Sequence, residues 1–543
     1  MTTTRLVGGR IVDGSGAPAF DGNVVIEDGR ILSVERAGSA AGAPVDRTVA
    51  LEGRVVAPGF IDMHSHADFL VPNADNDDLM RAFLEQGVTT IVAGNCGISP
   101  APCQSVTLAR HQRLSEIAVD RPFDWSWRGM GEYLEALDEA GLAVNVAQLV
   151  GHGSARFASS QCERGDLGQD LESALDAARR ALDEGSCGLS FGLGYDPGMY
   201  SSLDELEAFA RVAARADKPV TVHLKAYSWL SPTYPLASTW EAHNLRALDE
   251  MLGVAERAEA ALQVSHFIFV GRRTWATAAR ALERIDTARA RGQDVMIDAF
   301  PYTCGNTTIN VTLPYWFLAM GPAAYRSRTA RTRARIETEL GYRLVGLGWE
   351  DFQVMSIGVP EWEPLNGLSL GAIARRWNMR AFDALLAISE RSDGGALVLI
   401  HGYSGDRAGQ GPIRDVLTHE ACLYETDAIV RSEGWPNPAA VGTFPKILAD
   451  QVRRDGALRL EEAVRRMTGA SAARFGLDDC GTIAAGRAAD LVVFDPNTVS
   501  DVPPGPGRPA ERPVGIDRVF VNGQEVVTDG VASPLRAGRV LPV

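Results

Sequence analysis

Between residues 56 and 426 the chain alternates short apolar runs with longer segments in which apolar residues recur every three or four positions. A short uninterrupted run is typical of a strand buried on both faces, and the longer spacing is typical of a helix. The clearest helical segments are Asp170–Glu184, Leu203–Ala216 and Asn244–Ala261. Repeated strand–helix units of this kind predict a parallel sheet or an eight-stranded (β/α)8 barrel.

Nine apolar runs are candidates for the barrel strands, which is one more than such a barrel needs. Ala396–Ile400 is the weakest candidate, so we expect this run to lie outside the barrel. The runs are Val56–Met63, Thr89–Gly94, Val144–Val150, Cys187–Leu193, Pro219–His223, Leu262–His266, Val295–Ala299, Ala396–Ile400 and Ala421–Thr426.

Both ends of the chain have a different pattern, with short strand-like segments separated by turn residues such as Asp28-Gly29 and Asn522-Gly523. We expect residues 1–57 and 479–543 to form one small β-sandwich domain, and residues 58–478 to form the barrel. The expected terminal strands are Leu6–Val12, Asn23–Glu27, Arg30–Glu35, Thr48–Leu51, Asp490–Phe494, Arg518–Val521 and Gln524–Val527.

The barrel pattern is interrupted at Ala319–Glu390, which contains a basic helical stretch and no clear strand–helix unit. A long insertion after the seventh strand is well placed to cover the mouth of a barrel. The working hypothesis is that this insertion is a lid over the active site.

The net charge and the cysteine content limit the binding partners and the cellular location that we expect for this chain. The net charge of −16, from 53 basic and 69 acidic residues, disfavours nucleic acid or an anionic membrane as a partner. The seven cysteines have no regular spacing, and neither Met1–Asp13 nor any later run resembles a signal peptide or a membrane span. We therefore expect a reduced, cytoplasmic protein; a homo-oligomer is compatible with the sequence, which does not fix the oligomeric state.

Histidines gather where a barrel enzyme builds its active site. Five of the nine histidines stand at or just beyond the C-terminal ends of apolar runs, which is the catalytic face of such barrels. These five are His64, His66, His223, His266 and His401.

His64 and His66 are two residues apart on an extended chain, so both side chains point to the same side and can face one metal ion. The alternative is a pair of ordinary surface histidines at a strand end. His223 and His266 each end an apolar run. Each could be a core histidine, but two at the ends of consecutive strands favour metal ligation.

Cys96 lies in the turn Gly94-Asn95-Cys96-Gly97 and has three interpretations: a zinc ligand able to bridge two ions, a buried structural cysteine, or a covalent nucleophile. Related metal sites bridge two ions with a carboxylated lysine. The chain has only three lysines, Lys218, Lys225 and Lys446, and none ends the fourth apolar run. This favours Cys96 as the bridging ligand.

Asp427 ends the last candidate strand, where a carboxylate can accept and deliver the proton of a metal-bound water. The alternative is a helix N-cap, a frequent role of aspartate after a strand.

The segments that contain these candidate residues resemble the amidohydrolase superfamily and, within it, the N-acyl-D-amino-acid deacylases (D-aminoacylases). The resemblance covers nearly the full chain, and the Asn-Cys-Gly segment is its most specific part. The segments that carry it are Pro58–His66, Gly87–Thr90, Gly94–Pro100, Val150–Gly153, Gly188–Ser190, Gly192–Leu193, Pro197–Gly198, Thr221–His223, Ser265–His266, Phe300–Thr303, Gly442–Pro445, Gly481–Ile483 and Asp490–Val492.

The resemblance implies an α/β, TIM-like (β/α)8 metallo-dependent hydrolase barrel with a small β-sandwich domain. It implies one tightly bound Zn²⁺ held by Cys96, His223 and His266. A second, weaker position would use His64 and His66, with Cys96 shared between the two. Asp427 would be the catalytic acid and base in the hydrolysis of a C–N amide bond of a small N-acyl amino acid.

Further residues are candidates for substrate contacts. A free carboxylate on the substrate needs a cation, and Lys225 and Arg431 are suitably placed along the chain. Tyr195 and Tyr302 are expected to line the pocket. His152, or His66, is a candidate to stabilise the oxyanion.

The chain departs from the family pattern after its fifth-strand histidine. Lys225-Ala226-Tyr227 stands where the family usually has an arginine followed by an acidic residue, and Ala428 stands where it often has glycine. His401-Gly402-Tyr403 is also unusual for its segment. Three alternatives therefore stay open: the same site acting on a cyclic amide, a dipeptide or an acylated natural-product intermediate; a cysteine hydrolase; and a non-catalytic scaffold.

Overall fold

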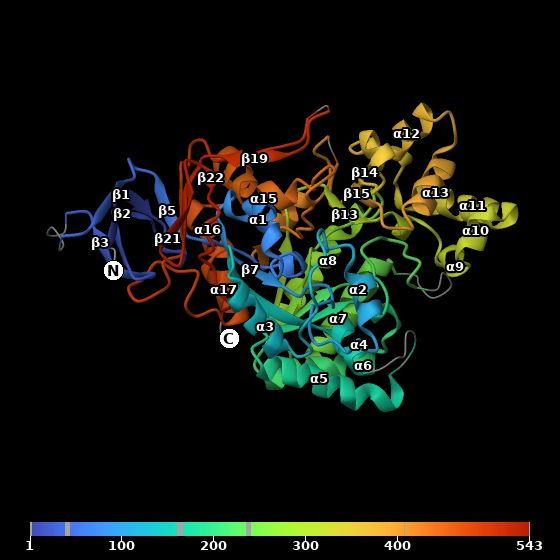
Figure 1. The fold of residues 1–543 in the computed structure, drawn as a ribbon, viewed down its shortest axis with the longest axis horizontal. Helices are drawn as coiled ribbons and strands as arrows, with labels where there is room; N and C mark the ends of the chain where they lie inside the picture. Colours follow the sequence, from blue (N-terminus) through green and yellow to red (C-terminus); the bar gives the residue numbers. More distant parts are fainter. Residues whose placement is uncertain are drawn as a thin grey trace.

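The computed structural model describes residues 3–38, 44–159, 165, 167–234, 241–406, 408–505, 507–541 and 543, and Cys162 lies outside these ranges. The chain forms three parts along its longest axis (Figure 1). A β domain built from both termini lies at one end, a small domain built from the insertion lies at the other, and the barrel lies between them.

The barrel is a parallel sheet of eight strands, as the alternating pattern predicts. Neighbouring strands follow one another in chain order, with one exception. β16 pairs with β12, and the insertion lies between these two strands in the sequence. The strands are β6 (Phe60–Asp62), β7 (Val88–Ala93), β8 (Asn145–Gly151), β9 (Gly188–Gly192), β10 (Val220–His223), β11 (Leu262–Val264), β12 (Val295–Ala299) and β16 (Cys422–Tyr424).

Helices cover the outside of the barrel, and the predicted helical segments are among them. They include α1 (Asp77–Leu84), α3 (Met130–Ala140), α5 (Leu171–Asp183), α6 (Leu203–Arg215), α7 (His243–Ala258) and α8 (Ala278–Ala290). The barrel interior is filled by side chains. Ile61, Met63, Val92, Leu149 and Leu423, from four different strands, belong to one buried cluster. The barrel is thus a packed core that presents its functional groups at the strand ends.

The first and last strands close the barrel at their C-terminal ends. Ser65 and Ala428 form a parallel bridge, and the N–H of His66 donates to the carbonyl of Ala428 at 3.2 Å. The carboxylate of Asp62 accepts the backbone N–H of Thr426 at 2.9 Å and the Thr426 hydroxyl at 2.5 Å. The buried Asp62 side chain therefore replaces part of the backbone hydrogen bonding between the first and last strands.

The insertion folds around a core of its own. A three-stranded antiparallel sheet of β13 (Cys304–Thr308), β15 (Leu397–His401) and β14 (Phe352–Ser356) packs with α11 (Arg328–Val345) and α13 (Ala381–Arg391). This domain encloses the predicted interruption at 319–390 and extends beyond it on both sides. Because β15 belongs to this sheet, the expectation that Ala396–Ile400 lies outside the barrel is confirmed.

The terminal β domain contains strands from both ends of the chain, as predicted. Its strands form one continuous nine-stranded sheet, and side chains from both ends share one core. The apolar run Val56–Met63 is divided at Gly59: β5 belongs to this sheet, and β6 begins the barrel. The strands are β1 (Thr4–Ile11), β2 (Phe20–Glu27), β3 (Arg30–Arg36), β4 (Arg47–Ala50), β5 (Val55–Pro58), β17 (Leu491–Phe494), β20 (Ile516–Val521), β21 (Gln524–Thr528) and β22 (Val531–Ala532).

The last described segment lies against barrel strand β8. The N–H of Val146 donates to the carbonyl of Arg539 at 3.0 Å, and the N–H of Leu541 donates to the carbonyl of Val146 at 2.9 Å. Leu541 also joins the buried cluster of the barrel interior. Among the described residues, every helix is too short or too polar to cross a membrane.

Candidate active site

The ends of strands β6 and β16 bring His64, His66 and Asp427 together. His64 is fully buried, and its Nε2 atom lies 3.6 Å from Oδ1 of Asp427. The Nε2 atom of His66 lies 3.4 Å from the same oxygen. The alternation of an extended chain therefore places both imidazoles on one side, as the His-x-His spacing predicts.

Cys96 reaches the same place from the turn after β7. Its backbone has φ of +56°, a left-handed conformation, and it stands next to Gly97 at φ +75°. A side chain at position 97 would meet the backbone nitrogen of Gly192 at 2.5 Å, so only glycine fits this close approach. The turn presents the Cys96 Sγ atom 3.3 Å from Nε2 of His64.

Two further histidines complete the cluster from β10 and the end of β11. Nδ1 of His223 and Nε2 of His266 each lie 3.6 Å from Sγ of Cys96, and they lie 2.9 Å from each other. The ring of Tyr227 packs edge-on against both imidazoles, with centroids 5.0 Å away. Its hydroxyl donates to the carbonyl of Ser265 at 3.0 Å and accepts the N–H of Leu224, which ties the two strand ends together.

The donor atoms match what zinc requires. One thiolate and two imidazole nitrogens from three separate strands converge at Cys96, His223 and His266, and this combination is typical of zinc sites. Two more groups of donors within 4.8 Å of one another share residues with this set: His64, His66 and Cys96 form one, and His64, His266 and Asp427 form the other.

The surroundings of the cluster favour the charged forms of Cys96 and Asp427. Burial raises the pKa of the Cys96 thiol, but the charge of His64 and the hydrogen bonds with His223 and His266 bring it well below its usual range. Burial likewise raises the pKa of Asp427, but the hydrogen bond from His66 and the charges of His266, His64 and His66 together outweigh burial, so that this pKa is lowered. A thiolate and a carboxylate suit metal binding and proton transfer.

The residues predicted to contact substrate lie in different surroundings. Tyr195 stands beside the cluster: its hydroxyl donates to the carbonyl of Cys96 at 2.6 Å, and its ring packs against His223. Lys225 is half-buried, and its Nζ atom lies 5.4 Å from the ring centre of Tyr234.

The other three predicted contacts have hydrogen-bond partners elsewhere in the fold. His152 is fully buried and bonds Glu205 at 2.8 Å. The Tyr302 hydroxyl donates to Asp501 at 2.9 Å. Arg431 donates to the carbonyls of residues 116, 117 and 119, beyond the end of helix α2 (Leu108–Ser115).

Sequence reasoning missed three buried acids near the cluster. Asp62, Asp298 and Glu425 are each no more than 1% exposed. Asp298 stands at the C-terminal end of β12, so the positional rule that selected the histidines would have found it. Asp62 ends β6 and Glu425 directly follows β16, so the same rule would have found these two acids as well.

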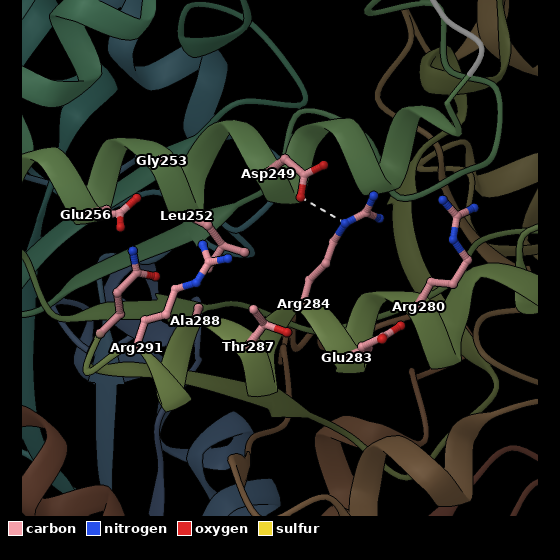
Figure 2. A pocket seen from close by; sticks show the side chains of 11 residues that line it. Asp249, Leu252, Gly253, Glu256, Arg280, Glu283, Arg284, Thr287, Ala288 and Arg291 are labelled. Carbon is pink, nitrogen blue, oxygen red and sulfur yellow. Dashed lines mark ion pairs between the residues drawn. The ribbon is translucent and has the colours of Figure 1, made fainter.

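A hollow on the outer helices lies away from this chemistry. Figure 2 shows a pocket between α7 and α8 of about 360 Å³, whose lining includes Asp249 and Arg284, paired at 2.9 Å. Its lining contains charges of both signs and none of the residues of the cluster. The cluster at the strand ends is therefore the candidate active site.

The comparisons with known proteins agree with this barrel. A model of the amidohydrolase family matches residues 47–311 and 435–527, and the chain belongs to this family. The stretch that the family model leaves out contains most of the insertion and Asp427. N-acyl-D-glutamate deacylase of Alcaligenes xylosoxydans xylosoxydans is 32% identical, over 98% of this chain and 95% of its own length.

Two solved structures are similar along the whole chain. The N-acyl-D-glutamate deacylase of Bordetella bronchiseptica, in complex with zinc and a phosphonate that mimics the tetrahedral intermediate, has a TM-score of 0.79 and 28% identity, with 100% of both chains covered. A D-aminoacylase studied for its binuclear metal centre has a TM-score of 0.77 and 27% identity at the same coverage. The chain is thus an amidohydrolase, and its relatives are metal-containing enzymes.

Proposed function

We propose that this chain is a zinc-dependent deacylase of N-acyl-D-amino acids. The observation that carries the proposal is the convergence of Cys96, His223 and His266 beside the carboxylate of Asp427. Each residue comes from the end of a different barrel strand, so the arrangement depends on the fold rather than on a local sequence motif.

Two metal positions fit the donors. The tight position would use Cys96, His223 and His266, whose two imidazole nitrogens lie 2.9 Å apart. The second, weaker position would be held by His64 and His66, with Cys96 as a donor common to both groups. Zinc, when bound, lowers the pKa of a coordinated water to about 7 and polarises a carbonyl oxygen.

Asp427 is the residue that accepts and then donates the proton in this mechanism. Oδ1 of Asp427 lies 3.6 Å and 3.4 Å from the Nε2 atoms of His64 and His66, so it stands beside both histidines of the second position. Its low pKa keeps the carboxylate ready to accept a proton from the attacking water. The same oxygen then delivers that proton to the leaving amine, because an amide nitrogen leaves only after protonation.

Lys225 and Tyr195 are the proposed substrate contacts. Lys225 follows His223 by two residues and offers a cation to the substrate carboxylate, and Tyr195 stands over His223. The D configuration comes from the similarity to N-acyl-D-glutamate deacylase and D-aminoacylase. We also propose a cytoplasmic location, since the six described cysteines are free thiols.

The test combines metal content with a substrate panel. Protein purified without added metal is analysed by mass spectrometry and assayed on N-acetyl-D- and L-amino acids with acidic and neutral side chains, and on cyclic amides. One to two zinc ions per chain and a preference for the D series support the proposal. If the protein binds zinc but is active only on cyclic amides, the proposed substrate class changes to cyclic amides. Chelator-resistant activity that a thiol reagent blocks would point to Cys96 as a nucleophile.

A further inference from the structure

Asp298 occupies one of the barrel strands that supply no residue to the groups of converging donors. It lies on β12, and the register pairs it with Leu423 of β16, a residue of the barrel interior. Paired residues of neighbouring strands point to the same face, so the Asp298 side chain points into the barrel beneath the cluster. It is 1% exposed.

The carboxylate of Asp298 contacts both groups of candidate ligands. Its Oδ1 atom accepts the backbone N–H of His266 at 2.6 Å and lies 3.8 Å from Nδ1 of His64. Its Oδ2 atom accepts the side-chain N–H of Gln263 at 2.8 Å. One acid thus reaches a histidine of the tight metal position and a histidine of the weaker one.

Both histidines need such a partner. His64 directs Nε2 toward Cys96, which leaves Nδ1 buried, with Asp298 as its nearest acid and no hydrogen bond. A metal-bound histidine usually gives its second N–H to a carboxylate, which fixes the ring and the tautomer. His266 has a backbone φ of +31°, which residues other than glycine rarely adopt. The hydrogen bond from its backbone N–H to Asp298 holds it in this conformation.

We infer that Asp298 is a positioning residue that sets the orientation of His64 and His266 together and so couples the two metal positions. The inference rests on the proposed zinc site. The role is indirect, because Asp298 belongs to none of the three groups of converging donors. Its contribution is to present Nε2 of both histidines to the same metal centre.

The test variant is Asp298→Asn, which keeps the shape and removes the charge. The asparagine oxygen still accepts the His266 N–H. The asparagine NH2 group can donate to Gln263 once the Gln263 amide has rotated, because Oε1 of Gln263 is buried without a partner. The metal-free variant should therefore unfold at the wild-type temperature. We expect its affinity for zinc, measured by competition with a chelator, to fall about 10- to 100-fold. We expect kcat to fall while KM stays within about twofold.

Glu425→Gln is the matched control. Glu425 is also a fully buried acid in this part of the barrel, and neither of its oxygens has a hydrogen-bond partner. Glutamine replaces another buried carboxyl group with an amide of the same shape without touching His64 or His266, so zinc affinity should stay within about twofold. Equal losses in both variants would show a general effect of replacing a buried acid and overturn the positioning role.

The outcomes also separate this inference from the proposed function. Wild-type protein that binds zinc and deacylates, beside an Asp298→Asn variant that does both equally well, would refute only the role of Asp298. Wild-type protein that binds no zinc would refute the metal site itself. Substitution of cobalt for zinc gives a third readout, because a changed visible spectrum in the variant would report altered ligand geometry.

Discussion

The backbone N–H of Asp427 donates a hydrogen bond of 3.0 Å to the carbonyl oxygen of His64. This bond joins the candidate acid–base residue on the last strand to a candidate metal ligand on the first. The barrel therefore closes at the active site, and Asp62 reinforces the closure through Thr426. Opening this seam would separate the proton acceptor from the metal donors.

Asp427→Asn should abolish deacylation but leave the tightly bound zinc. Asparagine has nearly the same shape and cannot accept the proton, so kcat should fall about 100- to 10,000-fold. Steady-state kinetics and metal analysis of the same preparation check both parts. Activity within a few-fold of wild type would remove Asp427 from the mechanism.

Cys96→Ala and His266→Ala should each lose zinc, because each removes one of the three donors of the tight position. His419→Ala is the control, since His419 pairs with Asp286 at 3.1 Å and belongs to none of the donor groups. Mass spectrometry after dialysis gives the zinc content of all three. Zinc retained at the wild-type level in the two donor variants would contradict the assignment.

Lys225→Met should weaken substrate binding and leave the metal. A hydrogen bond to a charged group contributes about 1.5–3 kcal/mol, so KM for an anionic substrate should rise about 10- to 100-fold. The long apolar side chain of methionine preserves the packing against Tyr234. If KM is unchanged for every N-acyl amino acid tested, the substrate carboxylate binds elsewhere.

Arg431→Met should affect stability rather than substrate binding. Its guanidinium donates to the partly exposed carbonyls of residues 116, 117 and 119, and such a hydrogen bond contributes about 0.5–1.5 kcal/mol. We expect a lower unfolding temperature with KM unchanged. A tenfold rise of KM at unchanged stability would instead assign Arg431 to the substrate.

Glu205→Gln should destabilise the fold by about 3 kcal/mol, because it leaves the buried guanidinium of Arg156 without its counter-charge. Burial raises the pKa of Glu205, but His152 and Arg156 lower it more, to about 2. The stability from this carboxylate is thus fully present above the unfolded pKa of about 4.3 and is lost as the pH falls through about 2.

Urea unfolding at several pH values tests this sign. The difference between wild type and Glu205→Gln should be largest near neutral pH and should shrink as the solution becomes acidic. Zinc content should not change, because the pair lies outside the donor groups. A difference that grows toward acidic pH would contradict the charge argument.

The sequence predicted the barrel because its strands are buried on both faces and carry an unbroken apolar signal. The positional rule brought His64, His223 and His266 to one place because parallel strands end on one face of the barrel. The interruption after the seventh strand was visible as a missing strand–helix unit. Its true extent was hidden, since β13 and β15 pair with each other across a long stretch of chain.

The partners of isolated polar residues could not be predicted. Tyr302, His152 and Arg431 carry suitable chemistry, but their hydrogen bonds go to Asp501, Glu205 and backbone carbonyls that are distant in sequence. The contacts of Asp298 with His64 and His266 likewise exist only after three strands have been assembled. Such relationships depend on tertiary packing and leave no local pattern.

The pairing of β5 with β17 has a consequence for how the protein is made. Residues 55–58 form a ladder with residues 491–494, and nearly the whole barrel lies between them. During synthesis the early strands must wait with an exposed edge until the late ones leave the ribosome, and such non-local pairing forms slowly. Low temperature during expression weakens the hydrophobic association of such exposed segments and should therefore raise the yield of correctly folded protein.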